Sequence, residues 1–170
     1  MATIVYKPIG VIRSPHRQLE AIPVQPEFSR GIEGYAELRP DLIEGLAGLE
    51  EFSHAYLLYH LHRVEQTRLE CVPFMDDQPH GIFATRAPWR PNPIGMSLVR
   101  LRGVEGPRLL LTDLDVLDGT PLLDIKPFYA APDPGDPVHR GWLDRVLPAE
   151  RRRRGRRDYR GPVLPEPEQE

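Results

Sequence analysis

The sequence predicts a mainly β protein with a few short helices. The chain of 170 residues contains 20 prolines and 14 glycines, and an interior proline costs a helix about 3 kcal/mol. This composition disfavours long helices and favours short strands joined by defined turns. The apolar segments do not alternate with helical ones as in βαβ units, and no GxGxxG or Walker glycine loop is present. A Rossmann fold is therefore not expected.

The first fifty residues predict two strands and a short helix. Tyr6–Arg13 forms the first predicted strand, which Pro15 ends. Gly34–Leu38 alternates as a second short strand. Asp41–Leu49 is typical of a short helix, with Asp41 as its N-cap.

The middle of the chain predicts two longer strands separated by a loop. Phe52–Leu61 is the most apolar run, and its aromatic residues favour a strand over a helix. Residues 63–80 are polar and irregular, as in a loop. Ile94–Gly103 begins with a turn and continues as a strand, with Leu98 and Arg100 on one face.

A hairpin is predicted after this strand. Leu109–Val116 and Leu122–Ile125 are apolar runs that flank Asp118 and Gly119. Asp-Gly between two such runs is typical of a tight hairpin turn.

Charge divides the chain into two parts. Residues 1–150 carry a net charge of −6 and residues 151–170 a net charge of +3. We expect 1–150 to be one folded domain and the arginine-rich tail 151–170 to be flexible. An acidic body is not a general nucleic-acid binder, because phosphate contacts supply most non-specific affinity. The tail suits electrostatic capture of RNA, and its candidate contacts are Arg151, Arg152, Arg153 and Arg154.

The sequence predicts a cytoplasmic protein that does not enter the membrane. Cys71 has no second cysteine with which to form an internal disulfide. No apolar run approaches the roughly 20 residues needed to span a bilayer. The N-terminal residues also lack the layout of a signal peptide.

The segment Gly81–Gly95, GIFATRAPWRPNPIG, is a candidate binding loop. Arg86 and Arg90 are four residues apart, and three prolines stiffen the backbone around them. A rigid guanidinium suits a carboxylate or a phosphate. The alternative is a proline-rich surface turn with solvated arginines, and the residues alone favour neither.

Four carboxylates surround the predicted hairpin. Alternation places Asp113 and Asp115 on one face of its first strand, while Asp124 and Lys126 share a face of the second. Such a group could bind a cation or a positively charged ligand. The alternative is a solvated face, with Asp118 serving the turn.

Six histidines make a metal site conceivable, but we predict none. His60 and His62 would share one side of a strand, yet the chain has no HExxH motif and no cysteine pair. A histidine that lines a pocket is the better interpretation.

Five blocks of the sequence closely resemble the TsaA/YaeB family, also called TrmO. They occur in the family's order and cover most of residues 9–128. The blocks are IGVIRSPH (9–16), PVQP (23–26), LEEFSHAYLL (49–58), GIFATRAPWRPNPIGMSLV (81–99) and LDVLDGTPLLDIKPF (114–128).

The resemblance implies a methyltransferase that uses S-adenosylmethionine on tRNA. The acceptor would be N6 of N6-threonylcarbamoyladenosine beside the anticodon. The resemblance also implies a barrel-like mixed sheet and a homodimer with the cofactor near the subunit interface. Family motifs place the cofactor contacts on Pro23, Val24, Gln25, Leu61, His62, Arg86, Met96, Thr112, Asp113, Leu114 and Asp115. The chain departs from the family pattern at Val24, Ala87 and Phe128.

Methyl transfer to such a nitrogen needs positioning of the reactants and a base. Asp115, Asp118, Asp124 and His62 are all candidates for the base. Asp118, Asp124 and Lys126 form the predicted catalytic set, with Lys126 and Arg90 as candidates for the threonyl carboxylate or adjacent phosphates. The alternatives are a non-catalytic module that binds S-adenosylmethionine or RNA, and a metal-dependent hydrolase.

Overall fold

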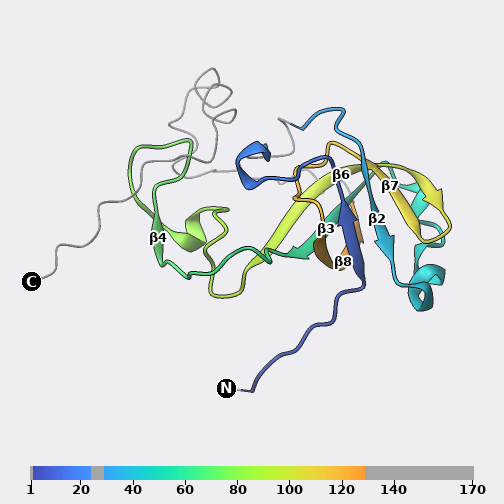
Figure 1. The fold of residues 1–170 in the computed structure, drawn as a ribbon, viewed down its shortest axis with the longest axis horizontal. Helices are drawn as coiled ribbons and strands as arrows, with labels where there is room; N and C mark the ends of the chain where they lie inside the picture. Colours follow the sequence, from blue (N-terminus) through green and yellow to red (C-terminus); the bar gives the residue numbers. More distant parts are fainter. Residues whose placement is uncertain (1, 24–28, 129–170) are drawn as a thin grey trace, which may run out of the picture.

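The computed structural model describes residues 2–23 and 29–128, and these residues form a closed β-barrel (Figure 1). Six strands close the barrel in the order β1-β2-β7-β6-β3-β8. Their bounds are Gly10–Arg13 (β1), Gly34–Leu38 (β2), His54–His60 (β3), Ile94–Glu105 (β6), Arg108–Thr112 (β7) and Thr120–Pro127 (β8). The predicted mainly β, barrel-like fold is confirmed.

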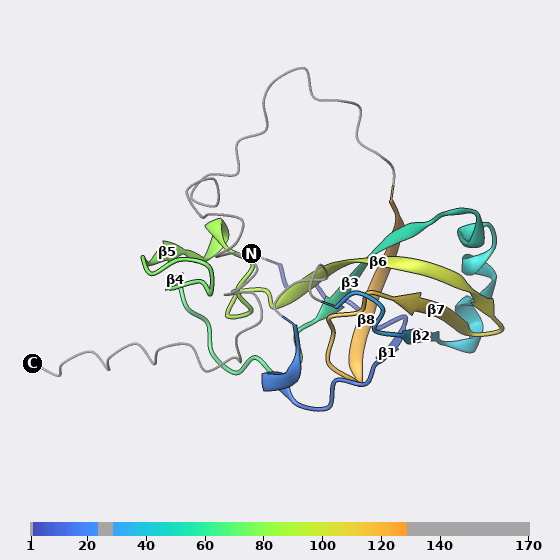
Figure 2. The ribbon, with the colours of Figure 1, turned by 90° about the horizontal axis from the view of Figure 1, so that it is seen from above.

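Short 3-10 helices and a second small sheet complete the described part of the chain. The helices are Leu19–Ala21 (η1), Pro40–Leu46 (η3), Leu49–Glu51 (η4) and Ile82–Ala84 (η5). The small sheet pairs β4 (Glu70–Cys71) with β5 (His80–Gly81). Figure 2 shows this sheet set apart from the barrel, on the side opposite η3 and η4.

The core is the inward face of the barrel strands. Alternate residues of each strand are buried, as the period of two requires. The fully buried side chains include Ile12, Leu57, Val99, Leu109, Leu111 and Leu122. Burial of such alkyl groups is the main source of stability, because each buried CH₂ contributes about 0.8 kcal/mol.

Three strand and helix predictions need correction. The first strand begins at Gly10 rather than Tyr6, because β2 and β8 pair only with residues from position 10 onward. The sheet is antiparallel in every pairing of the described residues, not mixed. The helix after β2 starts at Pro40, whose ring fixes φ. Asp41 therefore does not cap it and instead forms an ion pair with Arg39.

The predicted hairpin across Asp118-Gly119 is wrong. β7 pairs with β2 and β6, whereas β8 pairs with β1 and β3. The hairpin partner of β7 is β6, through the turn at Gly106, which has φ of 57°. Residues 113–119 instead cross one end of the barrel and bury Leu114 and Val116 in it. We call residues 113–119 the plug.

Candidate functional site

The loop Gly81–Gly95 is held in shape by one of its own arginines. Nη1 of Arg90 donates to the carbonyl oxygens of Ile82 (3.1 Å), Thr85 (2.9 Å) and Ala87 (3.4 Å). The guanidinium also lies 5.7 Å from the centre of the Phe83 ring. These contacts give Arg90 a structural role, because one cation satisfies three loop carbonyls. Its contact with RNA stays a prediction.

Residues 61–69 are hydrogen-bonded to the middle of this loop and to its C-terminal end. The backbone N–H of Leu61 donates to Pro93 O (2.8 Å), and that of Arg68 to Trp89 O (3.0 Å). The Arg68 guanidinium lies 4.8 Å over the Trp89 ring. The predicted cofactor contacts Leu61 and His62 therefore lie beside the end of the loop.

Met96 lies on the opposite face of β6 from the core. Its side chain is 45% exposed, next to Ile94, which is 41% exposed. Met96 pairs across the sheet with Leu58 of β3. The loop and β6 therefore carry an apolar strip on the outer wall of the barrel.

The structure brings Arg86 and Asp115 together from the loop and the plug. Burial raises the pKa of the Asp115 carboxyl to about 6, against the lowering effects of a hydrogen bond from Ser97 and the positive charge of Arg86. Oδ1 of Asp115 is buried and has no hydrogen-bond partner among the described residues. A buried acceptor without a partner is costly, so this oxygen is suited to receive a hydrogen bond from a ligand.

Asp113 and Asp115 do not share a strand face, contrary to the prediction. β7 ends at Thr112, and Asp113 has a left-handed backbone with φ of 65°. Asp113 accepts hydrogen bonds from Gly31 N (2.8 Å) and Arg100 Nε (3.4 Å). Thr112 and Leu114 are buried, so of the predicted contacts in 112–115 it is Asp115 that has an unsatisfied polar atom.

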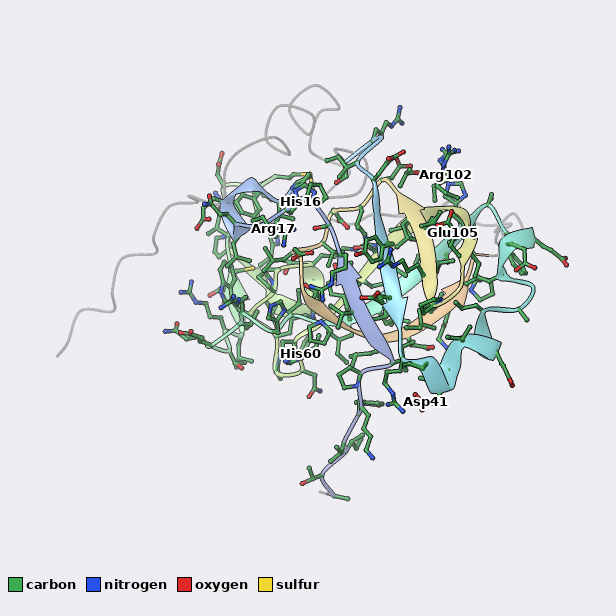
Figure 3. The ribbon with its side chains drawn as sticks, turned by 45° about the vertical axis from the view of Figure 1, so that its right-hand side comes forward. His16, Arg17, Asp41, His60, Arg102 and Glu105 are labelled. Atoms are coloured by element: carbon green, nitrogen blue, oxygen red, sulfur yellow. The ribbon has the colours of Figure 1, made fainter. Side chains whose placement is uncertain are left out.

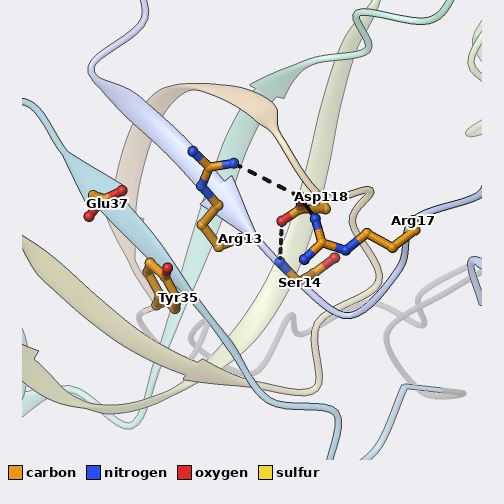
Figure 4. Close-up of a pocket in the computed structure, with 6 residues that line it drawn as sticks. All are labelled: Arg13, Ser14, Arg17, Tyr35, Glu37 and Asp118. Carbon is orange, nitrogen blue, oxygen red and sulfur yellow. Dashed lines mark hydrogen bonds and ion pairs between the residues drawn. The ribbon is translucent and has the colours of Figure 1, made fainter.

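Asp118, later in the plug, interacts with three groups of the N-terminal segment. It accepts a hydrogen bond from Ser14 N (3.1 Å), forms an ion pair with Arg17, and lies 3.9 Å from Arg13 (Figure 4). These residues line an open pocket of about 380 Å³ with Tyr35 and Glu37. Asp118 fixes the plug to β1, and its catalytic role stays a prediction.

Asp124 and Lys126 lie on the outer wall of the barrel. Nζ of Lys126 is 2.8 Å from Asp124 Oδ2, and both side chains are about half exposed or more. The hydrogen bond from this ammonium to Asp124, and the charge of Asp124, raise the pKa of Lys126. The two residues face solvent opposite Leu58 and Tyr56 of β3. Their catalytic roles stay predictions.

The histidines do not converge. The described residues contain no group of three or more His, Cys, Asp or Glu side chains that could hold a metal ion. β3 ends at His60, so His62 lies in a turn rather than on the strand face that was predicted. Burial, and secondarily the charge of Arg63, lowers the pKa of His62. Figure 3 shows His60 well apart from His16, whose ring nitrogen Nε2 lies 3.0 Å from Leu114 O.

Several predicted contacts are not tested by geometry. Pro23 is half-buried at the end of a described segment. Val24, Gln25 and the tail arginines Arg151, Arg152, Arg153 and Arg154 lie outside the described residues, as does the predicted boundary at 150.

Sequence reasoning missed the two buried hydroxyl groups beside Asp115. Ser97 points into the barrel from β6, and its Oγ lies 2.9 Å from the hydroxyl of Tyr59 on β3. The available signal was a serine at a core-facing position between Gly95 and Val99, where an apolar residue is expected.

Known proteins are similar to this chain over most of its length. Residues 11–134 match the tRNA-methyltransferase O N-terminal domain. The chain is 49% identical over 142 residues to a probable S-adenosyl-L-methionine-binding protein of Pyrococcus abyssi, covering 84% of this chain and 77% of that one. It is 37% identical to the tRNA (adenine(37)-N6)-methyltransferase of Escherichia coli K12, covering 75% of this chain and 59% of the relative.

A solved structure shares the fold. The crystal structure of TrmO from Pseudomonas aeruginosa superposes with a TM-score of 0.70 at 41% identity, covering 87% of this chain and 65% of that chain. The present chain therefore spans less than two thirds of this protein and of the E. coli relative.

Proposed function

The chain belongs to the tRNA-methyltransferase O family, and from this premise we propose that it is a tRNA methyltransferase that uses S-adenosylmethionine. The observation that supports this most directly is a partly buried Asp115 carboxyl with one unsatisfied oxygen, close enough to Arg86 for that positive charge to lower its pKa, within the family-matched segment. The names of two relatives also support the proposal, since one names S-adenosyl-L-methionine as the ligand and the other names adenine 37 of tRNA as the substrate.

The described residues fit the cofactor. S-adenosylmethionine has apolar adenine and methylene surfaces, and the exposed Met96 next to the loop suits contact with them. The exposed Arg86 suits the carboxylate of such a ligand. When bound, S-adenosylmethionine supplies an electrophilic methyl group on a sulfonium.

The acceptor in this proposal is N6 of N6-threonylcarbamoyladenosine in the anticodon loop. Bases in this loop are unpaired and can enter a pocket at little cost in base pairing. The threonyl carboxylate and the neighbouring phosphates are anionic. Lys126, Arg90 and the tail arginines Arg151, Arg152, Arg153 and Arg154 are the proposed cationic contacts.

We also propose that the protein is a cytoplasmic homodimer. The outer wall of β6 exposes Ile94 and Met96 in one strip, and exposed apolar strips of this kind commonly mark interfaces. A second copy covering this strip would bring the proposed cofactor contact Met96 to the interface. Cys71 is buried as a free thiol, which suits a reducing compartment. Among the described residues, no helix is long and apolar enough to cross a membrane.

The decisive experiment combines purified protein, methyl-labelled S-adenosylmethionine and two tRNA preparations, with and without threonylcarbamoyl on adenosine 37. We expect label in the modified tRNA only. Equal label in both preparations would indicate a tRNA methyltransferase whose acceptor is not N6-threonylcarbamoyladenosine. Binding of cofactor and tRNA without any label would instead indicate a non-catalytic binding module.

Exchange of Arg86 for alanine tests the cofactor site separately. We expect the affinity for S-adenosylmethionine, measured by calorimetry, to fall about 10-fold or more, because a charge-assisted contact contributes about 1.5–3 kcal/mol. Arg102→Ala is the matched control, since Arg102 lies at the far end of β6 (Figure 3). Unchanged affinity in Arg86→Ala would remove Arg86 from the site.

A further inference from the structure

A chain of buried hydroxyl groups leads to Asp115 from inside the barrel. The hydroxyls of Tyr59 and Ser97 lie 2.9 Å apart, and both side chains are buried. The Ser97 hydroxyl is in turn hydrogen-bonded to the Asp115 carboxyl. Gly95 leaves room for the Tyr59 ring, because a Cβ at position 95 would overlap that ring. The two strands β3 and β6 thus hold a hydroxyl pair in one position behind the carboxylate.

Asp115 is partly exposed, and one of its two carboxylate oxygens, Oδ1, is buried without a hydrogen-bond partner among the described residues. Arg86, from the loop, is the charged group whose field lowers the pKa of this carboxyl. The other acidic side chains of the plug are neutralised elsewhere: Asp113 by Arg100 and Asp118 by Arg17.

The two other carboxylate candidates for the proton acceptor are committed to other partners. Asp118 is satisfied by an amide and two arginines, and Asp124 is paired with Lys126 on the outer wall. The third candidate, His62, lies in the turn after β3, where burial lowers its pKa. Among these candidates, Asp115 alone has a buried oxygen with no hydrogen-bond partner.

We infer that Asp115 is the group that takes the proton from the acceptor nitrogen during methyl transfer, and that Ser97, backed by Tyr59, positions its carboxylate. This inference rests on the proposed function. Asp115 accepts the N6 proton as the nitrogen bonds to the methyl carbon and the methyl–sulfur bond breaks, its electron pair remaining on sulfur. Asp115 then releases the proton to solvent.

The electrostatics of the site are compatible with this role. A general base works best when its pKa is close to the working pH, and burial raises the pKa of Asp115 to about 6. The hydrogen bond from Ser97 stabilises the charged form and lowers this pKa, as does the nearby Arg86. Removal of the Ser97 hydroxyl should therefore raise it.

The first test measures single-turnover methylation of modified tRNA and, separately, cofactor affinity. We expect Asp115→Asn to slow methyl transfer about 100-fold or more while cofactor affinity changes by no more than a few-fold. Asp41→Asn is the control, because Asp41 lies on η3, away from His16 and Arg17 at the plug end (Figure 3). An unchanged rate in Asp115→Asn, or a loss explained entirely by weaker cofactor binding, overturns the inference.

The second test does not depend on turnover. A carbon-13 NMR titration of the side-chain carboxyls of the free protein should show one group titrating near pH 6 that is missing in Asp115→Asn. In Ser97→Ala this group should titrate at higher pH, and the acidic limb of the pH–rate profile should move by the same amount. Tyr59→Phe should produce a smaller shift in the same direction.

The outcomes separate this inference from the proposed function. If the wild-type protein methylates no tRNA, the proposed function is refuted, and the inferred role of Asp115 in proton transfer is refuted with it. If it methylates tRNA and Asp115→Asn does so equally well, only the inference fails. If Ser97→Ala slows the reaction without moving the pH profile, Ser97 is structural and its positioning role is refuted.

Discussion

Asp115 and Asp118 are three residues apart in the plug, yet their surroundings differ sharply. Asp118 is tied down by the Ser14 amide and by Arg17 and Arg13 of the N-terminal segment. Asp115 has a buried oxygen without a hydrogen-bond partner among the described residues, and its pKa responds to the Ser97 hydroxyl and to the charge of Arg86. The comparison shows that two carboxylates of the plug can differ in their number of partners, and the one short of partners is the one that we propose for chemistry.

The largest expected effect on stability comes from Asp115→Asn and depends on pH. The folded-state pKa of about 6 lies above the ordinary value of 3.8, so the folded protein binds the proton more tightly than the unfolded chain. The cost of ionising Asp115 is therefore absent below about pH 4 and complete above about pH 6. It amounts to about 3 kcal/mol at most, at 1.36 kcal/mol per pH unit.

Asp115→Asn removes this cost. Its free energy of unfolding should exceed that of the unmodified protein at pH 7.5, and the two values should converge near pH 4. Urea unfolding at several pH values measures the difference. If the difference in the free energy of unfolding between the two proteins did not change with pH, the raised pKa of Asp115 would be contradicted. The contrast between Asp115 and Asp118 would then be weaker.

Asp118→Ala should act in the opposite direction. It leaves the Ser14 N–H without its acceptor and removes the partner of Arg17. We expect the free energy of unfolding at pH 7.5 to fall by about 1–3 kcal/mol, the usual cost of an unsatisfied, partly buried donor. Thermal or urea unfolding measures it, with Glu105→Ala on the distant β6 as the control (Figure 3). Unimpaired stability together with lost methylation would restore Asp118 as a catalytic candidate.

The smallest effect is expected at the outer-wall pair. Asp124 and Lys126 are both well exposed, and exposed ion pairs contribute little to stability. Lys126→Met should leave the unfolding transition unchanged within error. A large loss of methylation with intact cofactor binding would support the predicted role of Lys126 at the threonyl carboxylate.

Much of the barrel was predictable because local patterns and tertiary pairing agree there. Gly34–Leu38 is the strand that was predicted, and Phe52–Leu61 contains β3. Alternation along β6 correctly separates Leu98 and Arg100 from the buried Val99. In each case one face is buried against the core and the other is not, so the period of two is visible in the sequence.

The plug was not predictable in the same way. Leu114 and Val116 alternate with polar residues as a strand would, and Asp118-Gly119 has the composition of a hairpin turn. The turn exists, with φ of 78° at Gly119, but Gly119 N donates to Ile12 O of β1. Strand pairing with β2 and β6 occupies both edges of β7, so β8 has no free edge there to join.

The sequence by itself determined the mainly β fold and the family, and it identified the segment Gly81–Gly95 as a candidate binding loop. These follow from local composition, periodicity and motifs. The tertiary structure decided which carboxylate lacks partners, because Arg13, Arg17, Ser97 and Arg86 reach the plug from segments far away in the chain. Burial and hydrogen bonding set the properties of Asp115, and both depend on how the barrel closes.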